Sequence, residues 1–427
     1  MPNNLYFVDS IFRSNGEEGG DNYVNLIFTD RSEDGYFPTF YVKVTKPQLI
    51  LVDSGREIEE GDYVFYVTNG EDDHRFSDGN QEQYAQEQIR AGQEIRESLA
   101  SKEQESAYTK LTANEVRVLT GAEEVCSYHV NVGHGNCSLI FAKSKDGYLL
   151  WMVDCSIIER GNKASKWQNH QSSLKACLGD IGRKIPVRKP HIGRFFLTHM
   201  HYDHYNGVEY LLRNGYIDEH TVYYINHYYE CNSETMVTFL KTLKSKNAVI
   251  IEPISANSLN TDVMILYPEK RIYKKGTSKG AANSMEVKNA NNASVVYRIA
   301  VNDRVMVFPG DLEKDGFDTM TQSKICSSGL HDSNYYVISH HGSLNGHPEN
   351  NCLGTHVFKT ALDCISRGLS KAVLLGRDGA YTTMFDPKVV DDFGINSKLI
   401  TTDMMFGKTS QKYLTLNWIN GGVQHYY

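Results

Sequence analysis

Four side chains that can bind a divalent metal lie within the six-residue run HMHYDH, at His199, His201, Asp203 and His204. Imidazole nitrogens and carboxylate oxygens are the donors that zinc and manganese take in proteins. Four such groups are costly to hold together unless a cation neutralises them. A histidine-rich surface loop is the alternative, but His-x-His-x-Asp-His is far more specific than two histidines at helical spacing. The run therefore predicts a metal site.

Two predicted elements flank this run. The apolar stretch Phe195–Leu197 precedes it and predicts a buried strand. Val208, Leu211 and Leu212 follow at helical spacing, and Gly215 is suited to end that helix. The predicted ligands would thus lie on a loop between a strand and a helix, where the edge of a sheet presents them to solvent.

Other predicted strands end in polar residues of the same kinds. The strand ending at Phe308 leads into Asp311, and the strand ending at Ile338 leads into His340 and His341. In open α/β sheets, sites lie outside the carboxyl ends of strands. A carboxylate has two oxygens and can bridge two cations ~3.5–4 Å apart. Together the strand ends supply enough side chains for two metal ions.

Composition limits the class of protein. The chain has 427 residues, 40% hydrophobic and 22% charged, as in ordinary globular proteins. A net charge of -8 gives no global attraction to nucleic acid or anionic membrane, although a local basic groove is compatible with it. The eight cysteines include no C-x-x-C pair, so we expect neither a disulfide framework nor a zinc finger. With no signal-like start and no ~18-residue apolar run, a soluble cytoplasmic protein without membrane contact is expected.

Three regions differ in pattern. Residues 1–76 predict a β-rich barrel or sandwich, from the short apolar runs Leu5–Val8, Tyr23–Phe28, Thr39–Val44, Gln48–Val52 and Tyr63–Val67 between turn clusters. Residues 77–120 are polar and rich in helix formers, which predicts a helical linker. Residues 121–427 alternate strands and helices and predict an α/β domain.

A lysine-rich segment at 268–292 has two interpretations. A lysine-rich run of this kind is usually a solvent-exposed loop. On an acidic chain it is also a local basic patch, in which Lys274 and Lys275 would contact an anionic substrate.

Residues 126–418 resemble the metallo-β-lactamase superfamily, whose signature is H-x-H-x-D-H. The nearest branch is the hydrolase domain of competence-type (ComEC-like) DNA-uptake proteins. Four further motifs are similar to that branch, in the expected order: NVGHGNCSLI at 131–140, WMVDC at 151–155, NNASVVYRI at 291–299 followed by RVMVFPGD at 304–311, and ISHHGS at 338–343. An ordered series is more specific than any single motif.

The resemblance implies an αβ/βα sandwich of two facing sheets, with two divalent ions at one edge, zinc as first choice and manganese as second. It assigns six ligands: His199 and His201 to the first ion, Asp203 and His204 to the second, Asp311 as the bridge, and His341 to complete one site. His340 competes with His341 for that last role. Asp154, at the end of its strand, would orient a ligating histidine.

The chain departs from the family pattern in three places, one of which is a later G-H-P-type motif that has no histidine here, where MFDP with Asp386 stands instead. Asn131, His134 and Asn136 stand where the family usually has Asp, Gln and Asp. The lone histidine that follows the cluster in the wider superfamily has no secure equivalent. His227 is a candidate ligand, although a histidine at the end of a tyrosine-rich strand is the simpler interpretation. Without it, water would fill an open position.

The expected chemistry is hydrolysis. A water shared by two such ions has a lowered pKa and attacks as hydroxide at neutral pH. Asp203 would orient it and move a proton, and His340 would protonate the leaving group or contact a phosphate. Ser343 would donate a hydrogen bond to the substrate.

Three functions compete. The first is cleavage of phosphodiesters by a nuclease or phosphodiesterase, with nucleic acid as the candidate substrate. The second is hydrolysis of carboxylic esters, amides or thioesters by the same ions. The third is a binding or sensor protein in which the N-terminal region recognises a protein partner or forms a homodimer. Fold alone does not decide between them.

Overall fold

The computed structural model describes residues 4–13, 22–68, 73–100, 110–163, 166–187, 189–277, 284–321, 329–330, 333–349, 360–376, 385–394, 398–402 and 411–427. The chain forms two compact units. The smaller unit contains Met1–Lys102, Ile158–Asn169 and Glu230–Thr242, and the larger unit contains the rest. The last two segments of the smaller unit come from the part of the sequence in which the hydrolase domain is predicted.

The smaller unit is built on one antiparallel five-stranded sheet of order β3-β2-β1-β4-β5. Its strands are β1 (Leu5–Phe12), β2 (Asn22–Phe28), β3 (Thr39–Val44), β4 (Tyr63–Thr68) and β5 (His74–Asp78). Val8, Leu26, Phe40, Val64 and Phe76 belong to its hydrophobic core. The N-terminal region is β-rich as predicted, but β3 and β5 are the two ends of the strand order and do not pair with each other, so the sheet is not a closed barrel.

The predicted strand at Gln48–Val52 is wrong. A 3₁₀ helix, η1, covers Lys46–Leu49, with Pro47 in its first turn. Thr45 and Gln48 form a capping box, in which the backbone N–H of Thr45 donates to Oε1 of Gln48 at 2.7 Å. Proline and a capping residue favour a helical turn over a ladder strand.

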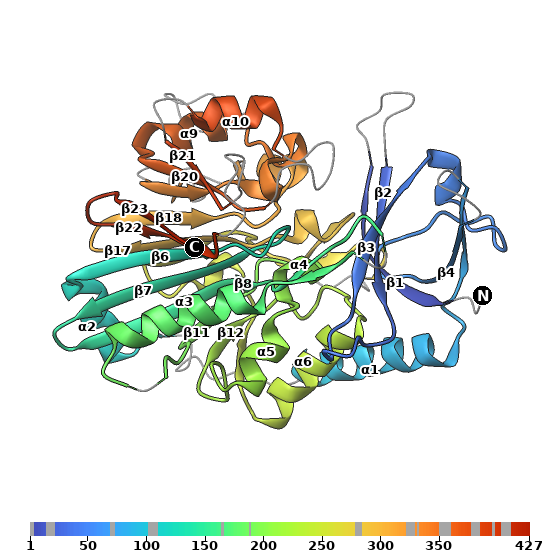
Figure 1. The fold of residues 1–427 in the computed structure, drawn as a ribbon, viewed down its shortest axis with the longest axis horizontal. Coiled ribbons are helices and arrows are strands. Elements are labelled where there is room, and N and C mark those ends of the chain that lie inside the picture. Colours follow the sequence, from blue (N-terminus) through green and yellow to red (C-terminus); the bar gives the residue numbers. More distant parts are fainter. Residues whose placement is uncertain are drawn as a thin grey trace. The chain divides into compact units, whose positions relative to one another are not determined.

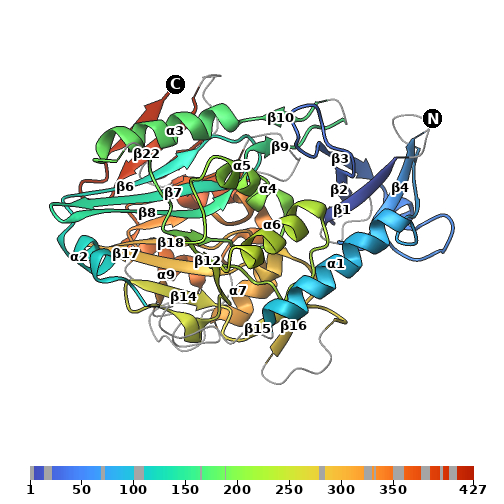
Figure 2. The ribbon, with the colours of Figure 1, turned by 90° about the horizontal axis from the view of Figure 1, so that it is seen from below.

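Polar contacts join the separate segments of the smaller unit. Helix α1 (Gln83–Ala100) runs beside the sheet, as Figure 2 shows, and Arg96 donates to Oδ1 of Asn232 at 2.9 Å. The hydroxyl of Tyr63 donates to the carbonyl of Asn232 at 2.8 Å. Arg160 directly follows β9 (Ile158–Glu159), which pairs with β10 (Gln168–Asn169), and it forms a buried ion pair with Asp9. These contacts depend on residues far apart in sequence, which local patterns do not reveal.

The larger unit contains two large mixed sheets. The first has the order β13-β12-β11-β8-β7-β6-β22-β23, and the second has the order β14-β17-β18-β19-β20-β21. The strands of the first sheet are β6 (Glu124–Val130), β7 (Cys137–Ser144), β8 (Gly147–Cys155), β11 (Arg194–Phe196), β12 (Val222–Tyr224), β13 (Val249–Ile251), β22 (Tyr413–Asn417) and β23 (Val423–Tyr426). Those of the second are β14 (Val263–Tyr267), β17 (Val296–Val301), β18 (Arg304–Phe308), β19 (Tyr335–Val337), β20 (Lys371–Leu374) and β21 (Leu399–Thr401).

Helices and short elements complete this unit. The helices are α2 (Ala113–Gly121), α3 (Gln171–Lys184), α4 (Tyr202–Tyr205), α5 (Val208–Arg213), α7 (Lys314–Thr321), α9 (Ala361–Gly368) and α10 (Pro387–Gly394). Helix α6 (Glu234–Ser245) belongs mostly to the smaller unit, and only its last turn belongs to the larger one. The 3₁₀ helices are η3 (Ser255–Asn257), η4 (Asn291–Ala293), η5 (Ser339–Gly342) and η6 (Leu344–Gly346). A separate parallel pair joins β15 (Arg271–Lys274) and β16 (Ser284–Val287).

The two large sheets share one hydrophobic core. Phe196 of the first sheet packs edge-on against Tyr297 of the second, with ring centroids 5.1 Å apart, and Trp151 and Trp418 are buried in the same core. Helix α3 lies on β6 and β22, while α10 lies on the other sheet, where Phe393 stacks on Tyr336 at 5.5 Å (Figure 1). The layers run helix, sheet, sheet, helix, which confirms the predicted α/β class.

The strands that carry the predicted site run in the same direction within each sheet. β8 and β11 pair in parallel, and so do β18 and β19. β6 is antiparallel to β7, which is antiparallel to β8, so β6 also ends at the edge where β8 ends. The carboxyl ends of these strands therefore deliver their following loops to common edges. Within the ranges that the structure describes, no helix has the length and apolar character needed to cross a bilayer.

Candidate metal centre

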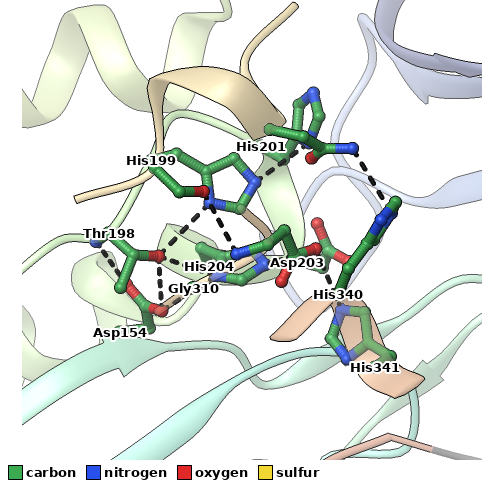
Figure 3. A network of polar contacts seen from close by, with 12 residues as sticks. Asp154, Thr198, His199, His201, Asp203, His204, Gly310, His340 and His341 are labelled. Atoms are coloured by element: carbon green, nitrogen blue, oxygen red, sulfur yellow. Dashed lines mark hydrogen bonds and ion pairs between the residues drawn. The ribbon is translucent and has the colours of Figure 1, made fainter. Parts of the chain in front are cut away.

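Two groups of three potential ligands are buried in the larger unit. In each group, one ligand atom per residue lies within 4.8 Å of the others. The groups are His199, His204 and Asp311, and His134, Asp203 and His341. Figure 3 shows most of these side chains converging on one another. Six buried groups of these types are donors that could bind divalent metal ions.

The HMHYDH run adopts the predicted strand–loop–helix form. β11 ends at Phe196, and His201 is the N-cap of α4, which carries Asp203 and His204. α5 follows, and Gly215 (φ 58°) closes it with its N–H donating to the carbonyl of Leu212 at 3.0 Å. The strand and the short helix fix the direction of the cluster.

Asp154 at the end of β8 orients the first group. Its carboxylate accepts hydrogen bonds from the N–H of Thr198 at 2.7 Å and from the hydroxyl of Thr198 at 2.8 Å. It also bonds Nδ1 of His204 at 2.8 Å. With Nδ1 occupied, the Nε2 atom of His204 is the nitrogen left to bind a metal ion, which is the usual arrangement of a carboxylate behind a ligating histidine.

Asp311 lies between the two groups. Its Oδ2 atom is 3.4 Å from Nε2 of His204 and 3.4 Å from Nε2 of His341. Gly310 (φ 59°) precedes it, and a Cβ at Gly310 would lie 2.6 Å from Cβ of Thr198, so only glycine allows this approach. Asp311 is therefore in contact with a histidine of each group, as a bridging ligand would be.

His341 and His340 face different partners. Both have φ of 49°, a region that non-glycine residues seldom adopt and that costs of order 1–3 kcal/mol each. Nδ1 of His341 lies 3.2 Å from the carbonyl oxygen of Leu375, and its Nε2 faces Asp203 at 3.6 Å. The strained turn thereby directs the second histidine of the pair into the site.

His340 lies at the border of the site. Its Nε2 is 3.3 Å from the side-chain nitrogen of Asn291, and its Nδ1 is 3.8 Å from Oε1 of Glu313. Burial lowers the pKa of His340, in spite of the nearby carboxylates of Asp311 and Glu313. The ring is therefore neutral at neutral pH.

The charges of the site are strongly coupled. Burial alone would lower the pKa of His204, but the carboxylates of Asp311 and Asp154 raise it well above its ordinary value. Burial likewise opposes the rise of the His341 pKa to about 9, which Asp311 and Asp203 cause. Burial would raise the pKa of Asp311, but His341 and His204 hold it well below its ordinary value. The carboxylates thus stabilise positive charge at the imidazoles of His204 and His341, either as a bound proton or as a bound cation.

These residues fit divalent cations. Nε2 of His204, Nε2 of His341 and Oδ1 of Asp311 are buried and have no hydrogen-bond partner among the residues that the structure describes. Two ligand atoms bound ~2.1 Å from one tetrahedral ion lie ~3.4 Å apart. The contacts of Asp311 with His204 and His341 have that length, whereas the hydrogen bond of His204 to Asp154 is 2.8 Å. The donor set of nitrogen and oxygen suits zinc or manganese.

His201 and His227 are predicted ligands outside both groups. Nδ1 of His201 lies 3.0 Å from Nε2 of His199. The structure thus groups His199 with His204, whereas the resemblance pairs His199 with His201. His227 is buried with its ring 4.2 Å from that of Tyr228, and neither group of the described residues includes it. Ligation by these two histidines stays a prediction.

The predicted substrate contacts lie in different settings. Ser343 is buried, and its hydroxyl accepts from the N–H of Asn345 at 3.4 Å as the N-cap of η6. Lys274 ends β15 and is partly buried, while Lys275 is exposed. Their contact with substrate stays a prediction.

His134 is the residue in these groups that we did not predict as a ligand. Its signal in the sequence is a histidine between two glycines directly after a strand, in GHG, the same strand-end position that marks the other ligands. The related motif usually has glutamine at this position, so the resemblance does not indicate a ligand here.

A third cluster of His347, Glu349 and Asp392 has a different character. His347 is fully buried and bonds Asp392 at 2.8 Å. Lys388 contacts Glu349 and lies 3.8 Å from Asp392. An ammonium group already contacts both carboxylates, which are only half-buried, so this cluster lacks the buried and uncompensated charge of the other two groups.

Comparisons with known proteins add little to this geometry. No family model matches the chain, and no curated protein matches it. A solved structure described as a long form RNase Z from yeast is similar over 66% of this chain and 41% of that chain, with 10% sequence identity and a TM-score of 0.27. The chain thus spans less than half the length of that structure. At this identity and TM-score the likeness assigns neither substrate nor residue roles.

Proposed function

We propose that this chain is a metallohydrolase of the metallo-β-lactamase type, in which two divalent ions, zinc first and manganese second, activate water for attack on a phosphodiester. The observation that carries the proposal is the pair of buried groups joined at Asp311, whose Oδ2 lies 3.4 Å from a histidine nitrogen of each group. A binding protein has no need for buried charges at this density, because they destabilise the fold unless a cation is bound.

His199, His204 and Asp311 would hold one ion, and Asp203 and His341 would hold the other with Asp311 between them. Such a pair of ions supplies a nucleophile at neutral pH and stabilises developing negative charge. Asp154 and the carbonyl of Leu375 keep Nε2 of His204 and of His341 directed inward. The carboxylate of Asp203 would orient the attacking water and take its proton.

His340 is suited to contact a phosphate oxygen. Asn291 donates toward Nε2 of His340, so the proton of the neutral ring is on Nδ1. That Nδ1 has no hydrogen-bond partner among the described residues, with Glu313 3.8 Å away. A neutral ring with a free N–H donates a hydrogen bond more readily than a proton, so between the two predicted roles we favour phosphate contact over protonation of the leaving group.

The choice of phosphodiester rests on the motif series and on the local basic segment. Lys274 and Lys275 lie at the end of β15 on a chain whose net charge is -8. Residues 278–283 of the same segment, which include Lys279, lie outside the described residues. A basic patch on an acidic protein favours an anionic substrate over a neutral ester.

The test uses metal-stripped protein reloaded with Zn²⁺ or Mn²⁺ and assayed on bis-p-nitrophenyl phosphate, DNA and RNA. We expect turnover that Asp311→Asn lowers by at least about 100-fold, since changes even behind a ligand cost 10–100-fold. Asp303→Asn makes the same chemical change in an exposed turn and should leave turnover unchanged. Activity on a carboxylic ester or thioester alone would favour the second function. A wild-type chain that binds no metal would point to a scaffold.

A further inference from the structure

We infer that His134 is a direct ligand of the metal ion held by Asp203 and His341. The inference rests on the proposed dinuclear site and deepens it, because it names the residue that completes the second coordination sphere.

The first support is the place of the ring. Nε2 of His134 lies 3.3 Å from Oδ2 of Asp203, and the centroid of its ring is 4.3 Å from that of His341. His134 is 3% exposed and His341 is 2% exposed. The separation of 3.3 Å matches the ~3.4 Å edge between two ligands of one tetrahedral ion.

The second support is the turn that holds His134. Gly133 (φ 66°) and Gly135 (φ 149°) flank it in conformations that favour glycine. A Cβ at Gly135 would lie 2.5 Å from Oγ of Ser156 and 2.9 Å from the carbonyl oxygen of Asp203. The N–H of Asn136 donates to that same carbonyl at 3.1 Å. The turn is therefore fixed directly to the backbone of Asp203, which sets where His134 can reach.

The third support is the number of ligands. Catalytic zinc sites take three protein ligands and leave one position for water. Asp203 and His341 give the second ion three protein ligands only if the shared Asp311 is counted, and His134 gives it three without that bridge. His134 raises its own ligands to a histidine pair and a carboxylate, matching the other group of His199, His204 and Asp311 in chemistry. It does so although the histidine expected later in the sequence has no secure equivalent.

A positioning role is the competing explanation, in which His134 only hydrogen-bonds Asp203. Glutamine at position 134 could take over the hydrogen bond to Asp203, but it could not replace histidine as a metal ligand. The side-chain amide of glutamine reaches about as far as Nε2 of histidine and can donate to a carboxylate. Imidazole nitrogen is a far better ligand for zinc than an amide. His134→Gln therefore preserves positioning and removes ligation.

The experiment measures metal binding without any substrate. Wild type, His134→Gln, His134→Ala and the exposed control His220→Gln are stripped and titrated with Zn²⁺ against a chromogenic chelator. We expect wild type and His220→Gln each to bind two Zn²⁺ ions with high affinity. In both His134 variants one ion should bind at least about 10–100-fold more weakly while the other is unchanged. Retention of both affinities in His134→Gln would contradict ligation and leave positioning.

A spectroscopic readout separates the loss of one ligand from a general loss of metal affinity. In the Co²⁺-loaded protein, each directly bound imidazole gives a proton resonance shifted far outside the ordinary NMR range by the unpaired electrons. His134→Gln should lose one such N–H signal relative to His220→Gln. An unchanged set of shifted signals would overturn the inference even if affinity fell.

The outcomes separate the two proposals. A wild-type chain that binds two ions but cleaves no phosphodiester refutes the proposed substrate and leaves the ligand assignment intact. A chain that cleaves phosphodiesters while His134→Gln keeps both ions refutes only the ligand assignment.

Discussion

At the scale of single residues, the site depends on which nitrogen of each histidine is already taken. Nδ1 of His204 bonds Asp154, Nδ1 of His341 faces the carbonyl of Leu375, and Nδ1 of His199 faces the hydroxyl of Thr198 at 3.2 Å. In His204 and His341, Nε2 is the atom left for the site, whereas Nε2 of His199 also lies 3.0 Å from Nδ1 of His201. The neighbours of the ligands therefore fix the ligand atoms before any metal ion binds, which lowers the cost of ordering on binding.

Asp154→Asn tests this directly. The amide keeps the shape of the carboxylate and tolerates the φ of 55° at this position. It loses the charge that holds the proton on Nδ1 of His204, so His204 is no longer held in the form that presents Nε2 to the metal ion. We expect the affinity for one metal ion to fall by about 10–100-fold with little change in fold, measured by competition with a chelator.

Asp303→Asn is the matched control for this change. Asp303 has a φ of 59° and lies exposed in the turn between β17 and β18, so the same substitution is made in the same backbone conformation away from the site. Its metal affinity should equal that of wild type. Equal affinities in all three proteins would show that Asp154 does not act on the ligand.

At the scale of elements, the sequence predicts the strand ends well and the turns between them poorly. Apolar runs followed by Asp154, Asp311 or the His340–His341 pair mark strands β8, β18 and β19, because a buried strand and its polar end are adjacent in sequence. The positive φ of His340 and His341, which directs them apart, has no signature in residue type.

The place of His134 could not be predicted for a related reason. Its approach to Asp203 depends on contacts between the 133–136 turn and α4, about 70 residues later in the chain, and no periodic pattern records such contacts. The same holds for the smaller unit, where Arg160 and Asn232 join strands near the N-terminus. Long-range pairing is what local patterns omit.

An ion pair joins α2 to the strand that leads into the ligand run. Glu115 closes the capping box of α2 with Thr112 and accepts from Arg194, the first residue of β11, at 2.7 and 2.8 Å. Burial would raise the pKa of Glu115, but Arg194 lowers it below its ordinary value. The pair fixes the start of β11 against α2.

Glu115→Gln should lower the free energy of unfolding by about 3–5 kcal/mol at pH 7, because it leaves Arg194 buried without its counterion. A carboxyl with a lowered folded pKa stabilises fully above its unfolded pKa of ~4.3 and loses that contribution as pH falls through the folded pKa. The difference in the free energy of unfolding between wild type and variant, measured by urea denaturation, should therefore be largest at pH 7. It should decrease below about pH 4.3. The exposed Glu123→Gln should differ from wild type by less than about 0.5 kcal/mol throughout. A gap that widens in acid would contradict the assignment.

At the scale of the whole molecule, the two units have separate hydrophobic cores. The core of the smaller unit uses residues such as Val8, Leu26 and Phe76, and that of the larger unit uses Trp151, Phe196 and Trp418. All residues of the proposed metal centre belong to the larger unit. Metal binding should therefore stabilise the larger unit, since an ion that binds only the folded state shifts the equilibrium of the unit that holds it.

Tryptophan fluorescence can isolate that effect. The chain has three tryptophans, and Trp167 lies in a segment of the smaller unit. In Trp167→Phe, the remaining emission comes from Trp151 and Trp418, both buried in the core of the larger unit. At a free metal concentration ~1,000 times the Kd, one ion contributes about 4 kcal/mol. We expect the midpoint temperature of thermal unfolding, followed by tryptophan fluorescence, to rise by several degrees when Zn²⁺ is added. It should fall again when a chelator removes the ion.

Asp311→Asn in the same background should abolish most of this shift, and Asp303→Asn should preserve it. Both variants retain the tryptophans, so the fluorescence reports the same core in each protein. A shift of equal size in Asp311→Asn would place the stabilising ion elsewhere in the chain. Since the readout needs no substrate, it tests whether the buried carboxylates and imidazoles require a cation to be stable, independently of the bond that the protein cleaves.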